Sequence, residues 1–152
     1  MPQAAPAGQR QRGLLRGEDS EAVRRALIEQ FGHAPGLIYE IRGSRKIYAY
    51  RPCGFDPKVR TDRGIYFGRI EADGIRLSIE GSFLVGPKAT KNVVELDDER
   101  ARRYLSGEDI EVNAELEGWV ILKWGSYYLG TGKLRGGRVH NYIPKERRLR
   151  IE

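Results

Sequence analysis

The sequence predicts an α+β fold built of two successive modules. Its first half shows one helical stretch followed by two β-hairpin patterns, and its second half shows a short helix between strand patterns. Between Lys123 and Arg148, glycine recurs at five positions and separates short runs of strand-forming residues. We therefore expect a flexible basic tail over 1–17, a helix with an antiparallel sheet over 18–90, and a module of strands and turns with a short helix over 91–152.

The first module is expected to open with a helix in the stretch GEDSEAVRRALIEQFG. Acids crowd its first turn, near the positive end of the helix dipole, while Val23, Leu27 and Phe31 recur every four residues. Gly32 is expected to end this helix. The preceding stretch is rich in Pro, Ala, Gly, Gln and Arg and has no hydrophobic periodicity, which predicts the flexible tail.

Two hairpin patterns follow the helix. The runs LIYEIRG and RKIYAYRP meet at Gly43-Ser44, and the two halves of GIYFGRIEADGIRLSIEG meet at Ala72-Asp73-Gly74. In the second hairpin Ile75, Leu77 and Ile79 alternate with polar residues, which predicts one buried and one exposed face. The next stretch, GSFLVGPKATKN, has Gly, Pro and Ser punctuation and is the expected boundary between the modules.

The second module is expected to begin with the strand VVEL. In DDERARRYLSGED, Asp97 is the expected N-cap of a short helix whose apolar stripe holds Ala101 and Leu105, and Gly107 is expected to end it. From Gly118 onward the pattern consists of strands and turns.

The charge balance favours a polyanionic partner. Lys and Arg total 27 against 21 acidic residues, which gives +6 and a pI near 9.6. A basic surface of mixed ion-pair networks, as in heat-stable proteins, is the alternative. Segregation of the cations from acids in the last thirty residues favours the first interpretation, so we expect the positive side chains there to form one solvent-facing patch.

Three motifs in order carry a resemblance to a known family. LSGEDI, SYYLGTGK and NYIPK, within 92–152, resemble the PUA domain, in the version appended to archaeal and bacterial RNA cytosine-5 methyltransferases. The preceding part resembles, by its layout and its FGRI hairpin, the pre-PUA module of ribosome-biogenesis factors. This resemblance implies a small pseudo-barrel that binds structured RNA, either rRNA or tRNA.

Cations and interleaved aromatic rings supply the candidate contacts. Cations attract phosphates, and aromatic faces stack on unpaired bases. Alternation places Tyr127 and Tyr128 on opposite faces, and we expect Tyr128 or Tyr142 at the surface and Trp119 in the core. The candidate RNA-binding residues, which include the lysines of the family's GxGK and PK positions, are Lys123, Tyr128, Lys133, Arg135, Arg138, Asn141, Tyr142, Lys145, Arg147 and Arg148.

Catalytic and metal-binding motifs are not recognisable in the sequence. Cys53 follows a proline, as in the nucleophile motif of the methyltransferases, but it lacks the acidic and Gly-rich surroundings of that motif and a strand-turn-helix pattern for a nucleotide cofactor. His33 and His140 have no ligand-like spacing. We therefore expect a protein that is not an enzyme and needs no cofactor or metal.

The leading hypothesis is a non-catalytic RNA-binding protein of RNA modification or ribosome biogenesis. The alternative is an interaction subunit that docks on a separate RNA methyltransferase or assembly factor through an apolar face such as Ile65, Phe67 and Leu84. The sequence has no apolar run of roughly 18 residues, and its start lacks the apolar stretch of a secretory signal, so we expect a cytoplasmic protein.

Overall fold

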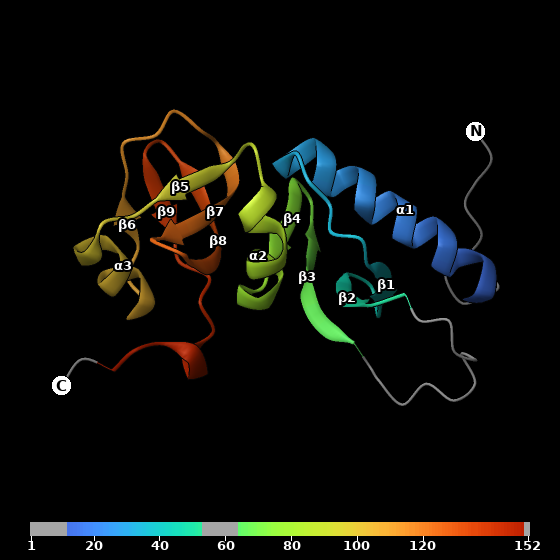
Figure 1. The fold of residues 1–152 in the computed structure, drawn as a ribbon. Helices are drawn as coiled ribbons and strands as arrows, with labels where there is room; N and C mark the ends of the chain where they lie inside the picture. Colours follow the sequence, from blue (N-terminus) through green and yellow to red (C-terminus); the bar gives the residue numbers. More distant parts are fainter. Residues whose placement is uncertain (1–11, 53–63, 151–152) are drawn as a thin grey trace.

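The computed structural model describes residues 12–52 and 64–150, and their side chains from residue 19 onward. Two sheets lie side by side along the molecule, with helix α2 between them (Figure 1). The first sheet has four strands in the order β1-β2-β3-β4, and the second has five in the order β5-β7-β8-β9-β6. The α+β class predicted from the sequence is confirmed.

Helix α1 (Arg12–Phe31) packs its predicted stripe against the first sheet. Val23, Leu27 and Phe31 are at most 2% exposed, and Gly32 follows with a φ of +80°. The helix begins six residues before the predicted boundary at Glu18. Arg and Leu in these residues have high helix propensity, which offsets the two glycines among them. The predicted tail is therefore wrong for residues 12–17, while residues 1–11 lie outside the described part.

The first sheet consists of the two predicted hairpins. Strand β1 (Ile38–Arg42) pairs with β2 (Lys46–Tyr50), and β3 (Ile65–Glu71) pairs with β4 (Gly74–Leu77), all antiparallel. Strand β4 stops at Leu77 because the Ser78 hydroxyl accepts a hydrogen bond from the Gly81 backbone at 2.9 Å. This cap begins α2 (Ile79–Val85), so the prediction that Ile79 continues the strand is wrong.

The second sheet has one parallel and several antiparallel pairs. Strand β5 (Val93–Glu95) runs parallel to β7 (Gly118–Trp124), which pairs with β8 (Tyr127–Arg135). Strand β9 (Arg138–His140) joins β8 to the short β6 (Ile110–Glu111). Helix α3 (Asp98–Leu105) begins at the predicted cap, where the Asp97 carboxylate accepts from the Arg100 backbone at 2.8 Å. Two 3-10 turns, η3 (Gly86–Lys88) and η4 (Lys145–Arg147), complete the described chain.

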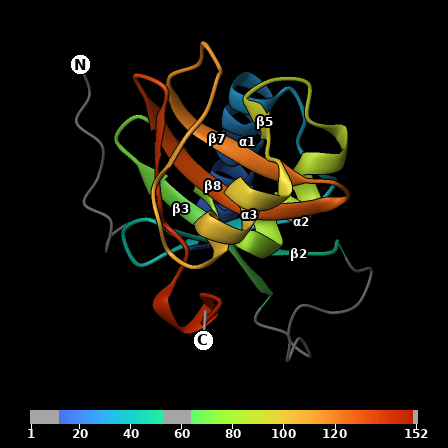
Figure 2. The same ribbon diagram turned by 90° about the vertical axis from the view of Figure 1, so that its left-hand side faces the viewer.

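The two sheets share buried contacts through α2. Ser82 of α2 is fully buried, and its hydroxyl accepts from the Gly130 backbone of β8 at 2.9 Å. Tyr128 of β8 belongs to the same hydrophobic core as the α1 stripe and packs its ring against Phe83. Viewed from the α3 end, β7 and β8 cross in front of α1 (Figure 2). Because α2 packs on both sheets, the packing does not mark a boundary between two modules. The division of the chain at residue 90 therefore stays a prediction.

Within the part of the chain that the structure describes, no helix is long and apolar enough to span a membrane.

Candidate nucleic-acid interface

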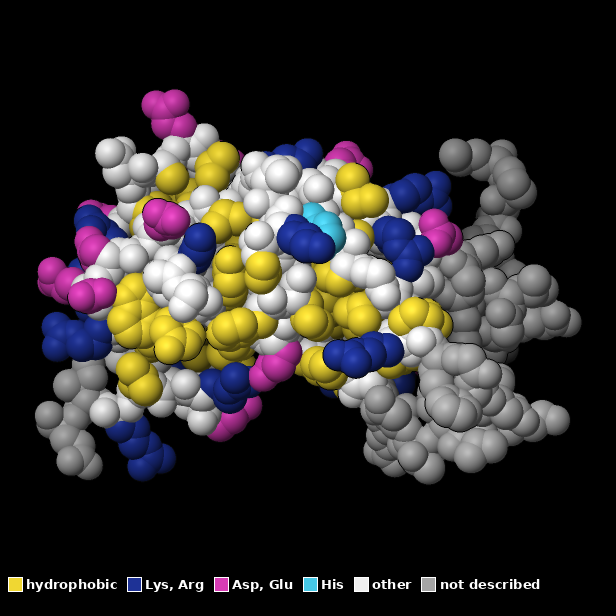
Figure 3. Space-filling view, in the orientation of Figure 1, with side chains coloured by type: hydrophobic (Ala, Val, Ile, Leu, Met, Phe, Trp, Pro, Cys, Tyr) yellow, Lys and Arg dark blue, Asp and Glu magenta, His cyan; other side chains and the backbone are white. Residues whose placement is uncertain are grey.

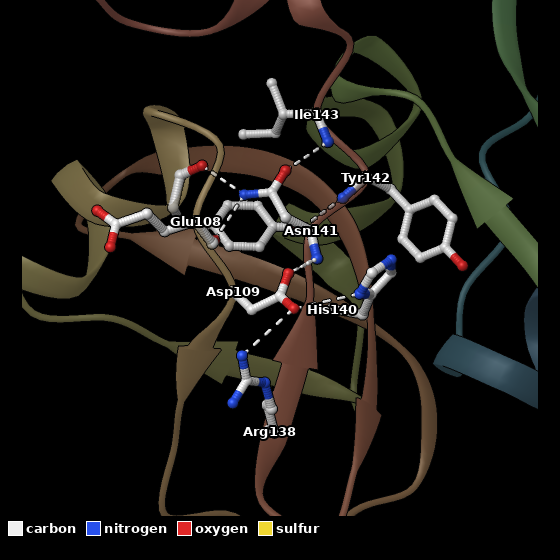
Figure 4. Close-up of polar contacts among 8 residues, drawn as sticks. Glu108, Asp109, Arg138, His140, Asn141, Tyr142 and Ile143 are labelled. Carbon is white, nitrogen blue, oxygen red and sulfur yellow. Dashed lines mark hydrogen bonds and ion pairs between the residues drawn. The ribbon is translucent and has the colours of Figure 1, made fainter. Parts of the chain in front are cut away.

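Asn141 fixes the segment that follows β9. Its amide nitrogen donates to the carbonyls of Tyr104 (2.6 Å) and Glu108 (2.8 Å), and its side-chain oxygen accepts from the Ile143 backbone (2.8 Å). The residue is only 8% exposed. Figure 4 shows the amide turned toward Glu108, while the ring of Tyr142 points away from this network. The hydrogen bonds thus hold the NYIPK motif against the α3–β6 connection.

Asp109 supports the same segment from the neighbouring loop (Figure 4). One carboxylate oxygen accepts from the Asn141 backbone at 2.8 Å, and the other lies 3.3 Å from His140 Nδ1 and 3.6 Å from Arg138. The backbone hydrogen bond, aided by the charges of His140 and Arg138, holds the pKa of Asp109 below its usual value. Asp109 therefore carries a negative charge that orients both basic side chains at neutral pH.

A row of three side chains crosses the second sheet. Trp119 of β7 is paired with Lys133 of β8, and Lys133 with His140 of β9. Directly paired residues of neighbouring strands place their side chains on the same face of a sheet. The Lys133 ammonium lies 5.5 Å from the Trp119 ring centroid, a cation–π distance. This face therefore combines aromatic and positive groups.

The first module completes this face with Asp73 and Arg76. Asp73 accepts from the Trp119 indole and from the Lys133 ammonium, both at 2.8 Å, and these two bonds lower its pKa. The Arg76 guanidinium lies 4.9 Å from the centroid of the Tyr142 ring, which in turn meets Trp119 edge-to-face at 4.7 Å. We call this set the junction cluster; its members are Asp73, Arg76, Trp119, Lys133, His140 and Tyr142.

The predicted single patch of unpaired cations is wrong in two respects. Acidic side chains from elsewhere in the chain pair with four of the cations: Lys123 with Glu95, Lys133 with Asp73, Arg138 with Asp109, and Arg147 with Glu80. The cations also lie on different elements, from β7 to η4. On the face shown in Figure 3, Lys and Arg side chains are separated from one another and interspersed with acids.

Two of the predicted RNA-binding residues are buried instead. Tyr128 is 7% exposed, since α2 covers its side of β8 and a Cβ on Gly86 would lie 2.3 Å from its ring. Asn141 is held by the three hydrogen bonds described above. The prediction of a surface position is therefore wrong for Tyr128, whereas Trp119 is buried as predicted, at 4% exposure.

The remaining candidates are accessible to different degrees. Arg135, Arg138 and Lys145 are exposed, and within the described residues no carboxylate lies within ion-pair distance of Arg135 or Lys145. The Arg148 guanidinium instead donates to the Ile143 carbonyl at 3.1 Å and packs beside Gly107. Arg148 therefore fastens the C-terminal segment.

Sequence reasoning missed four members of the junction cluster as site residues: Asp73, Arg76, His140, and Trp119, which was expected only in the core. Asp73 and Arg76 belong to a hairpin far from the NYIPK motif in sequence, and nothing local indicates that they meet it. His140 was considered only as a metal ligand or as part of a catalytic histidine pair with His33. Its place one residue before the motif's asparagine was the available signal, because alternation puts His140 and Tyr142 on the side opposite to Asn141.

Comparison with known proteins defines the class of the second module. Residues 91–149 match the family model described as the methyltransferase RsmF PUA domain. The chain therefore contains a PUA domain that resembles the PUA domain of RNA cytosine-5 methyltransferases, as the three motifs predicted.

Particular relatives extend the similarity beyond this domain. Ribosomal RNA small subunit methyltransferase F of Aeromonas salmonicida (strain A449) is 32% identical over 135 residues, covering 87% of this chain and 28% of the relative. The protein of the same name from Aeromonas hydrophila is 31% identical with the same coverage, and that from Shewanella sp. (strain ANA-3) is 36% identical over 102 residues, covering 60% and 21%. The chain thus spans about 28% of the length of the Aeromonas relatives.

Proposed function

We propose that this protein binds structured RNA, rRNA or tRNA, without performing catalysis itself, in RNA modification or ribosome biogenesis. The observation that carries the proposal is the PUA match over residues 91–149. The relatives named as ribosomal RNA methyltransferases point to the same class of ligand.

The surface of the PUA domain supports the proposal chemically. Arg135 and Lys145 are exposed and have no ion-pair partner among the described residues, so each can take a phosphate directly. Arg138 and Arg147 each have an acidic partner, but the arginine side chains themselves are 64% and 44% exposed. Such exposed pairs are worth about 0–1 kcal/mol, so a phosphate can replace the carboxylate at little cost.

Binding measured over a salt series tests the proposal. Filter binding to total RNA should give a Kd of micromolar or better that rises steeply with salt, because cation release accompanies phosphate contacts. Arg135→Gln with Lys145→Gln should reduce the slope of log K against log salt by roughly one for each phosphate that the removed charge had neutralised. Lys46→Gln with Lys88→Gln removes the same charge from exposed positions outside the PUA match and is the control.

Failure to bind RNA at low salt, or equal losses of affinity in both double variants, would contradict the proposed surface. The melting temperature of each double variant should stay within about 4 °C of wild type, since each surface substitution usually changes stability by less than about 0.5 kcal/mol. A large drop would show that these side chains stabilise the fold.

The topology of the two sheets supports the proposal that the protein does not perform catalysis. Within residues 12–52 and 64–150, one sheet is antiparallel and the other has a single parallel pair. A doubly wound parallel sheet for a nucleotide cofactor is therefore not formed by these residues. Cys53 lies outside the described part. The test is incubation of the protein with RNA and labelled S-adenosylmethionine, in which no methyl transfer is expected; transfer that Cys53→Ser abolishes would contradict the proposal.

A second candidate function is docking on a separate RNA methyltransferase or assembly factor. Phe83 and Leu84 of α2 are adjacent, apolar and 43% and 37% exposed. The apolar face predicted from the sequence is corrected at Phe67, which is fully buried, while Ile65 is 48% exposed. Phe83→Ser with Leu84→Ser should abolish co-purification of such a partner and leave RNA affinity unchanged. Unchanged co-purification would remove this candidate.

A further inference from the structure

A pocket lies where the two modules meet, beside the junction cluster. Its volume is about 270 Å³, and it is bounded by the end of β4, the start of α2, the middle of β8 and the segment after β9. The residues that matter here are Tyr66, Arg76, Ile79, Glu80, Tyr142 and Arg147. Small-molecule sites usually span roughly 300–1,000 Å³. The pocket is therefore suited to one small ring system.

The walls of the pocket combine flat and apolar surfaces. Tyr66 lines the pocket and is 39% exposed, and its ring packs against the Tyr48 ring at 5.6 Å between centroids. On the PUA side, the Arg76 guanidinium lies 4.9 Å from the Tyr142 ring, and both groups line the pocket. Ile79 adds an apolar wall from α2. Unpaired bases stack on aromatic rings and on guanidinium planes of this kind.

The rim of the pocket carries an ion pair with spare hydrogen-bonding capacity. Arg147 Nη1 donates to Glu80 Oε1 at 2.6 Å, and both side chains are 44% exposed. A carboxylate offers about four acceptor positions, so Glu80 can still accept from a further donor. Arg147 likewise keeps donors for a phosphate oxygen. Positive charge, an acceptor and stacking surfaces thus meet at one opening.

From this arrangement we infer that the pocket binds one unstacked base of single-stranded RNA, with the adjoining phosphate on Arg147. The inference rests on the proposed function, which it deepens by naming the part of the RNA that is held. Because Glu80 only accepts hydrogen bonds, it is matched by donors on the base edge; the amino group of cytosine or adenine offers two hydrogens where uracil offers a single ring N–H, so these bases should bind in preference to uracil.

The test compares two fluorescent octamers of equal charge. One is a single-stranded RNA of mixed sequence, and the other carries abasic ribose phosphates throughout. Wild type should bind the base-bearing octamer more tightly. Tyr66→Ala should lower that affinity roughly 5- to 150-fold, the range for removal of one stacked ring, and should change abasic binding less than about twofold.

Matched variants separate the pocket from general effects. Tyr127→Ala removes a tyrosine that is 56% exposed and lies outside the pocket, so it should bind both octamers like wild type. Ile79→Trp fills the pocket and should act like Tyr66→Ala. Glu80→Gln, with its weaker acceptor, should reduce the preference for a U-octamer with one central cytidine over the all-U octamer.

The outcomes separate the pocket from the proposed function. Equal affinity of wild type for base-bearing and abasic octamers, or equal effects of Tyr66→Ala and Tyr127→Ala, would overturn the pocket and leave RNA binding intact. Absence of binding to either octamer and to total RNA at low salt would overturn the proposed function as well.

Discussion

Replacement of Asn141 by alanine should destabilise the protein without touching the exposed cations. The change removes three hydrogen bonds, those to the carbonyls of Tyr104 and Glu108 and from the Ile143 backbone. A typical intramolecular hydrogen bond contributes roughly 0.5–1.5 kcal/mol net, so three together give about 3 kcal/mol. One kcal/mol shifts the melting temperature of a protein of about this size by roughly 2–4 °C. The expected drop is therefore about 6–12 °C.

Thermal unfolding followed by circular dichroism, with urea unfolding for the free energy, measures this drop. Asn141→Asp should destabilise at least as much at neutral pH, because a carboxylate cannot donate to the two carbonyls. Lys145→Ala is the control, since this exposed lysine has no ion pair among the described residues. If Asn141→Ala melts within about 2 °C of wild type and loses RNA affinity, Asn141 contacts RNA directly and the structural interpretation is refuted.

Two further predictions concern single contacts of the fold. Asp109→Asn should lower the free energy of unfolding at pH 7 and lower it less near pH 3. The folded-state pKa of Asp109 is lowered, so its stabilisation is present above the unfolded pKa of about 3.9 and is lost as the pH falls through the folded value. If urea unfolding gives the same free-energy difference between wild type and variant at both pH values, this prediction is contradicted. Gly86→Ala should lower the free energy of unfolding by about 1–3 kcal/mol, because a Cβ there would lie 2.3 Å from the Tyr128 ring. Gly36→Ala is the control, since a Cβ at Gly36 would have nothing within 4 Å and this variant should melt close to wild type. Equal melting temperatures of the two variants would show that the Tyr128 ring can move aside.

Local patterns in the sequence predicted much of the fold. The α1 stripe, both hairpins and the Asp97 cap follow from spacing over a few residues, and the structure has all of them. The helical course of residues 79–85 was missed because it depends on one serine cap at the end of a strand pattern. Short apolar runs fit either a strand or a helix, so periodicity alone does not decide between them.

The candidate site was less predictable because its contacts are long-range. Lys133 and Asp73 are 60 positions apart, and Arg147 and Glu80 are 67 positions apart. Local sequence composition does not show such pairs, so the cations looked unpaired. Alternation correctly placed Tyr127 and Tyr128 on opposite faces of β8. However, β8 is buried over most of its length, between α2 and the hydrophobic core of the second sheet. The face that water reaches therefore depended on a helix that the sequence did not predict.

The polar motif that carried the resemblance has a structural task that sets the direction of its neighbours. Asn141 points inward and is held by three backbone groups, so the residues on either side must point outward. His140 and Tyr142 then meet edge-to-face at 5.0 Å, and Tyr142 reaches Arg76 of the first module. Asn141 thus orients Tyr142, which lines the pocket beside the junction cluster together with Arg76. If RNA enters there, as we propose, substitution of Asn141 weakens binding by displacing Tyr142, and abasic RNA should be bound almost as well as before.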